Sequence, residues 1–264
     1  MKKVFLYLVI GLVVLLIAIS VGVGLFIGPI IKTGVETLGP KITQVSIKLD
    51  AVDVSLLSGA AVIKGLVVGN PEGYKTPEAI RLGKASVSID PMSVTSSKIV
   101  VKSIRVESPE ITFDGGLSGN NISKILDNVN SVAAKPESEQ PKSAAPDKSK
   151  EAAAKPAPKI QVDEFLITGA KVHVRLNAVV ASQDMTVPLP DIHLKDLGKG
   201  TEGITPAELV RVVLTQVNVA TMKAVTESVA KSGKVLEDIG KGVSKESVET
   251  IKGIGKDLGG LFKK

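Results

Sequence analysis

Cysteine and tryptophan are absent from this chain of 264 residues, and histidine occurs only twice. A chain without cysteine has neither a disulfide scaffold nor a thiolate-ligated metal site, and two histidines are too few for a histidine-rich metal centre. Aromatic residues make up only 3% of the chain, and the net charge of +6 is spread thinly. Bases therefore have almost nothing to stack on, and we predict no nucleic-acid partner.

Catalytic motifs are missing as well. The chain holds no G-x-S-x-G nucleophile sequence, and its Gly-Lys-Gly segments at 198–200 and 240–242 lack the spacing of a phosphate-binding loop. His173 and His193 fall on polar faces of expected strands, where a histidine is more often solvated than bound to metal, although Asp191 lies two residues from His193. We expect no enzyme, no metal and no cofactor.

One long hydrophobic run is present, at residues 4–31. It contains no charged residue, and twenty of its 28 residues are Val, Leu, Ile or Phe. As a helix it would be about 42 Å long, more than the roughly 30 Å of the bilayer core, whereas a cleavable signal needs only about 7–15 apolar residues. We predict that residues 1–32 form a retained single-pass anchor. Lys2 and Lys3 keep the N-terminus cytoplasmic and place the remainder outside.

Gly24 and Gly28 form a G-x-x-x-G pattern within this run. Such spacing places two small residues on one helix face, where a second membrane helix approaches closely. Glycine is also common in membrane helices without that role, so the pattern has two interpretations. We name both residues as candidates for membrane-helix packing.

Alternating apolar and polar residues dominate residues 33–132. This period of two predicts antiparallel strands with one apolar and one wet face, separated by turns such as Gly69–Gly73 and Ser108–Pro109. Asn121 is expected to cap a short helix over 122–130, with an apolar stripe formed by Ile122, Ile125, Leu126 and Val129. The apolar positions that we expect to line one face of the sheet here are Val45, Ile47, Leu49, Val87, Ile89, Ile104 and Val106.

A linker separates this segment from a second β segment at 160–200. Residues 133–159 contain five prolines and no apolar residue larger than Ala, which predicts a disordered tether. Alternation then resumes, with Val172, Val174 and Leu176 on the apolar face. We expect the second segment to complete the first sheet. About ten strands would make it about 50 Å wide.

The spacing of apolar residues in 201–264 predicts an amphipathic helical tail. Thr205 and Glu208 form a capping box around Pro206, which indicates a helix over 206–232. Residues 231–264 add eight lysines and five acidic residues beside an apolar stripe. That stripe suits either an anionic membrane surface or the protein's own sheet.

Residues 1–130 resemble the N-terminal part of the AsmA-like family of envelope proteins, with a looser similarity at 160–197. The similarity rests on the membrane helix, Gly69-Asn70-Pro71-Glu72-Gly73-Tyr74, the strand at 85–90, the run 99–113 and Gly119-Asn120-Asn121-Ile122. It implies an anchor in the inner membrane and a β-rich periplasmic groove lined by apolar side chains. It also implies a role in outer-membrane biogenesis and phospholipid transport. For the large members of the family, the resemblance implies long bridges that carry lipid. This chain is short for such a bridge.

The sequence thus predicts a mainly β protein with some α: a transmembrane helix, a curved antiparallel groove-like sheet and C-terminal amphipathic helices. The leading hypothesis is an apolar groove for a phospholipid or another acyl-chain lipid. The alternating face fits an ordinary core covered by the helix at 206–232 equally well. The second hypothesis is a scaffold that recruits an envelope partner through a sheet edge or the C-terminal helices.

Overall fold

The computed structural model describes residues 27–55, 58–136, 139–140, 158–176, 185–200 and 202–231. The predicted anchor up to residue 26, Gly24, the interior of the linker and the tail beyond 231 lie outside these residues. A helix over 27–43 comes first. The other elements, in chain order, are β1 (Ile47–Lys48), β2 (Ala51–Ser55), β3 (Ala60–Gly69), β4 (Glu78–Ile89), η1 (Pro91–Thr95), β5 (Lys98–Glu107), β6 (Glu110–Gly116), β7 (Gly119–Asn120), α2 (Asn121–Ala133), β8 (Lys159–Thr168), β9 (Lys171–Leu176), β10 (Met185–Pro188), β11 (Ile192–Leu197) and α3 (Pro206–Lys231).

The helix over 27–43 runs through the boundary expected at residue 32 and packs on β2. Gly28 lies against the backbone carbonyl of Val52, so its missing side chain lets this helix approach the chain's own strand. The Glu36 carboxylate accepts a hydrogen bond from the backbone N–H of Leu49 at 2.9 Å. Within the described residues, no helix has both the length and the hydropathy needed to cross a membrane.

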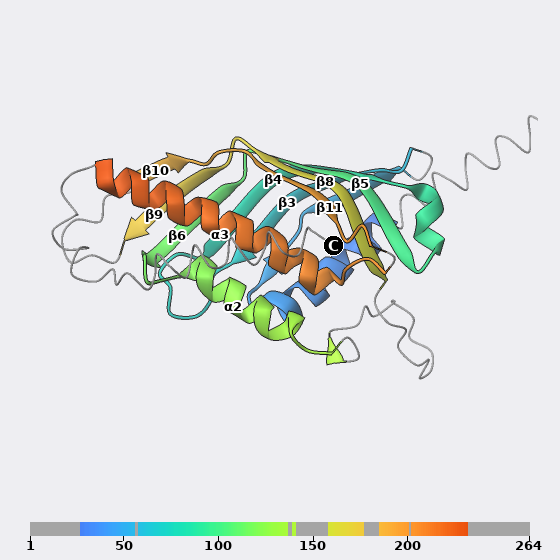
Figure 1. The fold of residues 1–264 in the computed structure, drawn as a ribbon, viewed down its shortest axis with the longest axis horizontal. Helices are drawn as coiled ribbons and strands as arrows, with labels where there is room; N and C mark the ends of the chain where they lie inside the picture. Colours follow the sequence, from blue (N-terminus) through green and yellow to red (C-terminus); the bar gives the residue numbers. More distant parts are fainter. Residues whose placement is uncertain are drawn as a thin grey trace, which may run out of the picture.

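A single curved sheet contains the eleven described strands and confirms that the second β segment completes the first (Figure 1). The prediction of a wholly antiparallel sheet is wrong, because β5 pairs with β8 and β6 pairs with β9 in parallel. The physical reason is the connection. The chain leaves β7, passes through α2 and the linker, and re-enters the sheet in the direction of β5 and β6, as a crossover connection requires.

Several neighbouring elements are two halves of one longer strand. The pairing register is unchanged from β1 to β2, from β5 to β6, from β8 to β9 and from β10 to β11. With β3 and β4, the main sheet therefore consists of six rows rather than ten separate strands. Six rows span about 24 Å, which is half of the expected width.

A crease crosses all six rows at one register position. In three of the rows, Ser108, Gly169 and Gly65 have φ values of 48°, 63° and 62°, which interrupts the pleat there. In a regular strand, side chains three residues apart point to opposite faces. Because of the crease, Glu107 and Glu110 are both exposed on the same face. The residues along the crease are Asp50, Gly65, Gly83, Ser108, Gly169 and Pro190.

A second irregularity runs parallel to the crease. The register of β4 and β5 shifts after Ser88, and Asp196 in β11 has a φ of 57°. On β5, Val101 and Ile104 both contribute to the apolar face although they are three residues apart. The two interruptions bend the sheet and divide it into panels, which is how a bulge produces local curvature.

Two helices pack on the sheet: α2 contacts β6 and β7, which precede the crossover, and α3 contacts strands formed after it. α3 runs along the front of the sheet in Figure 1 with α2 below it, and the contacts of α3 fall on α2, β8, β10 and β11. The predicted capping box is confirmed, since Thr205 Oγ1 accepts from the N–H of Glu208 at 3.2 Å. Asn121 is not the cap of α2: the carboxamide oxygen of Asn120 accepts from the N–H of Ser123 at 2.9 Å.

The apolar residues of α3 do not form the single stripe that an amphipathic helix would have. Val217, Ala224 and Val225 are buried, whereas Leu209 and Val212 are half-buried on other turns. α2 fits the amphipathic pattern better, because its predicted stripe is buried in full. α3 thus has few exposed side chains, but many of them are half-buried rather than buried.

Candidate functional site

The ten residues predicted to line the groove fall into two sets. Four are buried in the core: Val45, Leu49, Val172 and Val174. Six are half-buried and pack at its margin: Ile47, Val87, Ile89, Ile104, Val106 and Leu176. The predicted face is therefore continuous, but its parts differ in how far the described chain covers them.

The part around β6 and β9 is closed. Val172 is 0% exposed and pairs with Ile111 on one side and Val187 on the other. Phe113, Ile125 and residues of α3 belong to the same buried cluster. This part of the face is an ordinary core that α2 and α3 seal.

The panel between the two irregularities is different. Here two rows of apolar side chains cross five neighbouring strands, in register. They are Leu194, Phe165, Ile104, Val87 and Ala61 in one row, and Ile192, Ile167, Val106, Ala85 and Ile63 in the other. We call these ten residues the apolar strip. Four steps between neighbouring strands make it about 19 Å long. Leu194, Ile104, Val87, Val106 and Ile63 are half-buried rather than sealed.

The opposite face of this panel is charged. Arg105 lies 3.5 Å and His193 lies 3.0 Å from the carboxylate of Glu164, which joins β5, β8 and β11 across the surface. His173 lies 3.1 Å from the hydroxyl of Thr186 and 4.0 Å from Glu110. Both histidines thus contact polar neighbours on exposed strand faces. Among the described residues, no group of three or more acidic or histidine side chains is arranged to hold a metal.

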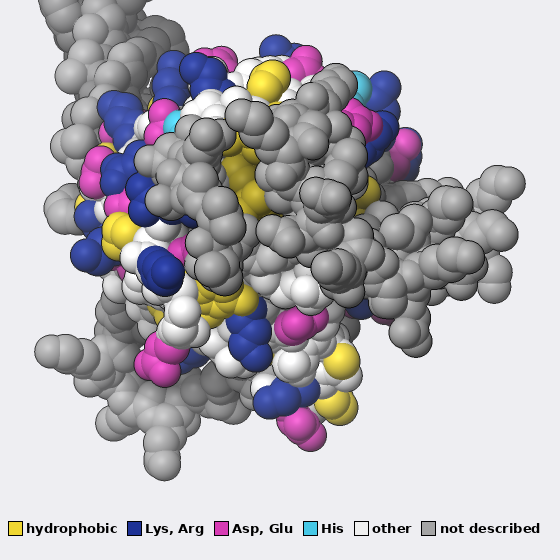
Figure 2. Space-filling model, turned by 90° about the vertical axis from the view of Figure 1, so that its left-hand side faces the viewer, with side chains coloured by type: hydrophobic (Ala, Val, Ile, Leu, Met, Phe, Trp, Pro, Cys, Tyr) yellow, Lys and Arg dark blue, Asp and Glu magenta, His cyan; other side chains and the backbone are white. Residues whose placement is uncertain are grey.

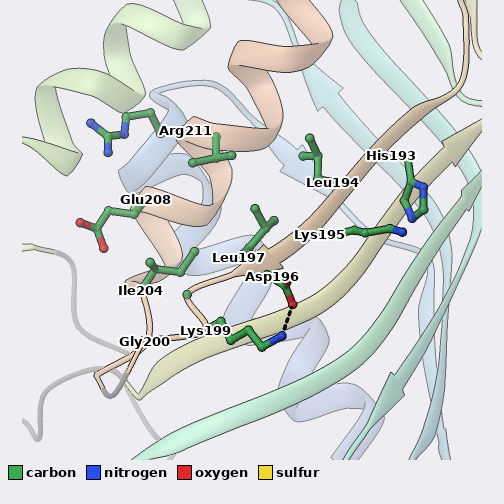
Figure 3. Close-up of a pocket in the computed structure, with 13 residues that line it drawn as sticks. His193, Leu194, Lys195, Asp196, Leu197, Lys199, Gly200, Ile204, Glu208 and Arg211 are labelled. Carbon is green, nitrogen blue, oxygen red and sulfur yellow. Dashed lines mark hydrogen bonds and ion pairs between the residues drawn. The ribbon is translucent and has the colours of Figure 1, made fainter. Parts of the chain in front are cut away.

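A cavity of about 800 Å³ opens between β11 and the first turns of α3. Figure 3 shows Leu194 and Leu197 in the space between the strand and the helix, with Ile204 below them. Val212 of α3 completes the aliphatic wall. Because Leu194 also ends one row of the apolar strip, the cavity and the strip meet at this residue.

Charged side chains surround this aliphatic wall. Arg211 and Glu208 project from α3, and Lys195 lies along β11 (Figure 3). Lys199 Nζ lies 2.8 Å from Asp196 Oδ1, and this hydrogen bond raises the pKa of Lys199. The lining is therefore mixed, with four aliphatic side chains, three glycines and six ionisable side chains. A volume in this range is typical of a small-molecule site.

A buried polar cluster closes the end of the sheet near β7, and the sequence analysis missed it. Asp114 is 1% exposed, and its Oδ2 accepts hydrogen bonds from the N–H groups of Lys75 and Thr76 at 2.8 and 3.0 Å. Asn121 Nδ2 donates to Asn70 Oδ1 at 2.7 Å. The cluster ties the turn after β3 to β6 and α2. The clustering of polar turn residues in the sequence was its only signal.

Apolar side chains are visible from the end of the molecule that carries β9, β10 and the C-terminal end of α3. Figure 2 shows hydrophobic side chains near the middle of this end, with Lys, Arg, Asp and Glu side chains around them.

Comparisons of this chain with protein-family models, with curated proteins and with solved structures find no match.

Proposed function

We propose that this chain is a non-enzymatic, inner-membrane-anchored periplasmic protein whose curved sheet holds the acyl chain of a lipid, in envelope maintenance or phospholipid transport. The observation that carries the proposal is the apolar strip. Two in-register rows of apolar side chains cross five strands, and five of the ten side chains are half-buried. The resemblance of residues 1–130 to AsmA-like proteins supports the same function.

The dimensions of the strip suit one acyl chain. Its length of about 19 Å exceeds the roughly 15 Å that each leaflet contributes to the hydrocarbon core. Each methylene that leaves water for such a surface is stabilised by about 0.8 kcal/mol. The main sheet, about 24 Å across, is too narrow to bridge two membranes, so the proposal is a lipid holder and not a complete bridge.

A scaffold that recruits partners through the edge strand is the alternative, and the outer edge of the sheet disfavours it. Pro188 and Pro190 lie in the β10–β11 row and have no N–H to donate, and Asp196 breaks the pleat of β11. These features are typical of edges that do not accept another strand.

Light-activated crosslinking in the membrane tests the proposal. A photoreactive benzoylphenylalanine replaces Ile104 in the full chain, and a second variant carries it at Arg105, which lies next in β5 on the charged face. We expect acyl lipid to be captured at position 104 and not at 105. Equal capture at both positions, or none at 104, would overturn the proposal.

A further inference from the structure

The cavity between β11 and α3 has unused positive charge beside its aliphatic wall. Arg211 is half-buried, and its guanidinium has no hydrogen-bond or ion-pair partner in the part of the chain that the structure describes. Glu208, one turn earlier, accepts the N–H of Thr205 at 2.8 Å, but this neutral donor leaves its negative charge in place, so the Lys, Arg, Asp and Glu side chains of the lining carry a net charge of +1. A partly buried cation without a partner favours an anion from outside.

The remaining charges around the cavity do not change this balance. Asp196 is held by Lys199, so its negative charge is already matched. The side chain of Lys195 is exposed on β11 and also has no partner among the described residues. Lys195 alternates with Leu194 and lies opposite Glu164 on the charged face of β11, so Arg211 is the cation left to face an anionic group in the cavity.

The cavity also meets the apolar strip at Leu194. A molecule that occupies both needs an anionic head and a long apolar tail. We propose that the cavity holds the anionic headgroup of an acyl lipid, with Arg211 as its main ligand, while the tail lies along the strip. This inference rests on the proposed function and adds the headgroup charge to it. A phosphate diester and a carboxylate share the required chemistry.

Selective capture tests the inference. The full chain with benzoylphenylalanine at Ile104 is placed in nanodiscs of phosphatidylcholine mixed with an equal amount of phosphatidylglycerol, or of oleate. We expect each anionic lipid that fits to be captured about tenfold more than phosphatidylcholine, the factor that one charge-assisted hydrogen bond gives. The two mixtures distinguish a phosphate from a carboxylate source.

Substitutions in α3 test whether the preference for anionic lipid depends on the cavity. Arg211→Gln should reduce it to nearly equal capture, and Arg211→Lys, which keeps the charge, should retain most of it. Lys223→Gln, at an exposed position of α3, should have no effect. Equal capture of neutral and anionic lipids by the unaltered chain, or a preference that survives Arg211→Gln, would overturn the inference but leave the proposed function intact. No capture of any lipid would remove both. Unchanged melting of each variant shows that the fold is retained.

Discussion

Substitution of Gly169 by Ala tests the crease that bends the sheet. Gly169 has a φ of 63°, and a left-handed backbone costs an L-residue about 1–2 kcal/mol. An added Cβ would also lie 3.1 Å from the hydroxyl oxygen of Ser108 in the neighbouring row. Gly83 lies on the same crease, but nothing lies within 4 Å of a Cβ added there and its backbone is not left-handed. Gly83→Ala should therefore stabilise the chain by about 0.4–1 kcal/mol.

The two variants should differ by roughly 1.5–3 kcal/mol in the free energy of unfolding, on the magnitudes of these two effects. For a chain of this size, that difference separates their melting temperatures by about 3–6 °C. Thermal unfolding of the full chain in micelles, followed by circular dichroism, measures it. Equal melting temperatures, or a greater loss in Gly83→Ala, would show that the crease does not depend on the left-handed conformation.

Three other substitutions test the packing and the polar cluster. Thr221 is 0% exposed, and its hydroxyl has no hydrogen-bond partner among the residues that the structure describes, so Thr221→Val should raise the free energy of unfolding by about 1 kcal/mol in a urea titration. Thr215→Val, which loses a hydrogen bond to a backbone carbonyl, should not. Asp114→Ala removes the acceptor of two N–H groups, that of Thr76 buried and that of Lys75 partly buried, and should cost about 3 kcal/mol by the same titration. A loss below 1 kcal/mol would contradict this account of the cluster. Burial, and then the nearby charge of Asp114, raise the pKa of Tyr74 above 10.0. The folded chain holds the phenol proton of Tyr74 more tightly than the unfolded chain does. The protonated phenol therefore adds to the free energy of unfolding below pH 10.0, and this contribution is lost as the pH rises through the higher folded pKa. In a Tyr7→Phe chain, the phenolate absorbance of Tyr74 should appear above pH 10.0 and shift down in Asp114→Ala, and a midpoint at or below 10.0 would contradict the assignment.

Local patterns in the sequence predicted many of the elements. Period-two alternation identified β5, β6 and β9, and the capping box located the start of α3 at Pro206. These signals are local. The face of a strand depends on alternate residues, and a helix cap depends on residues about three apart in the chain. The buried stripe of α2 was predicted for the same reason.

The arrangement of the strands was not predictable in this way. The crease joins six residues far apart in the chain, and only the pairing register shows that Gly65, Ser108 and Gly169 belong to one line. The parallel pairing of β5 with β8 likewise depends on where the chain returns after the linker. The division between sealed core and half-buried strip depends on where α2 and α3 lie, and Val172 and Val106 have the same local pattern.

Comparing the folding of Ile104→Glu and Val172→Glu distinguishes the half-buried apolar strip from the sealed core. Ile104 is half-buried at the centre of the strip, so a charge there should leave the fold intact and repel an acyl tail. Val172 is 0% exposed, so the same charge should unfold the chain. Circular dichroism reports the folding of both variants.

Native mass spectrometry of the full chain released from membranes measures the central claim most directly. The account predicts a bound acyl lipid on the unaltered chain and none on a folded Ile104→Glu chain. Identical lipid content in the two, or an unaltered chain free of lipid, would contradict it.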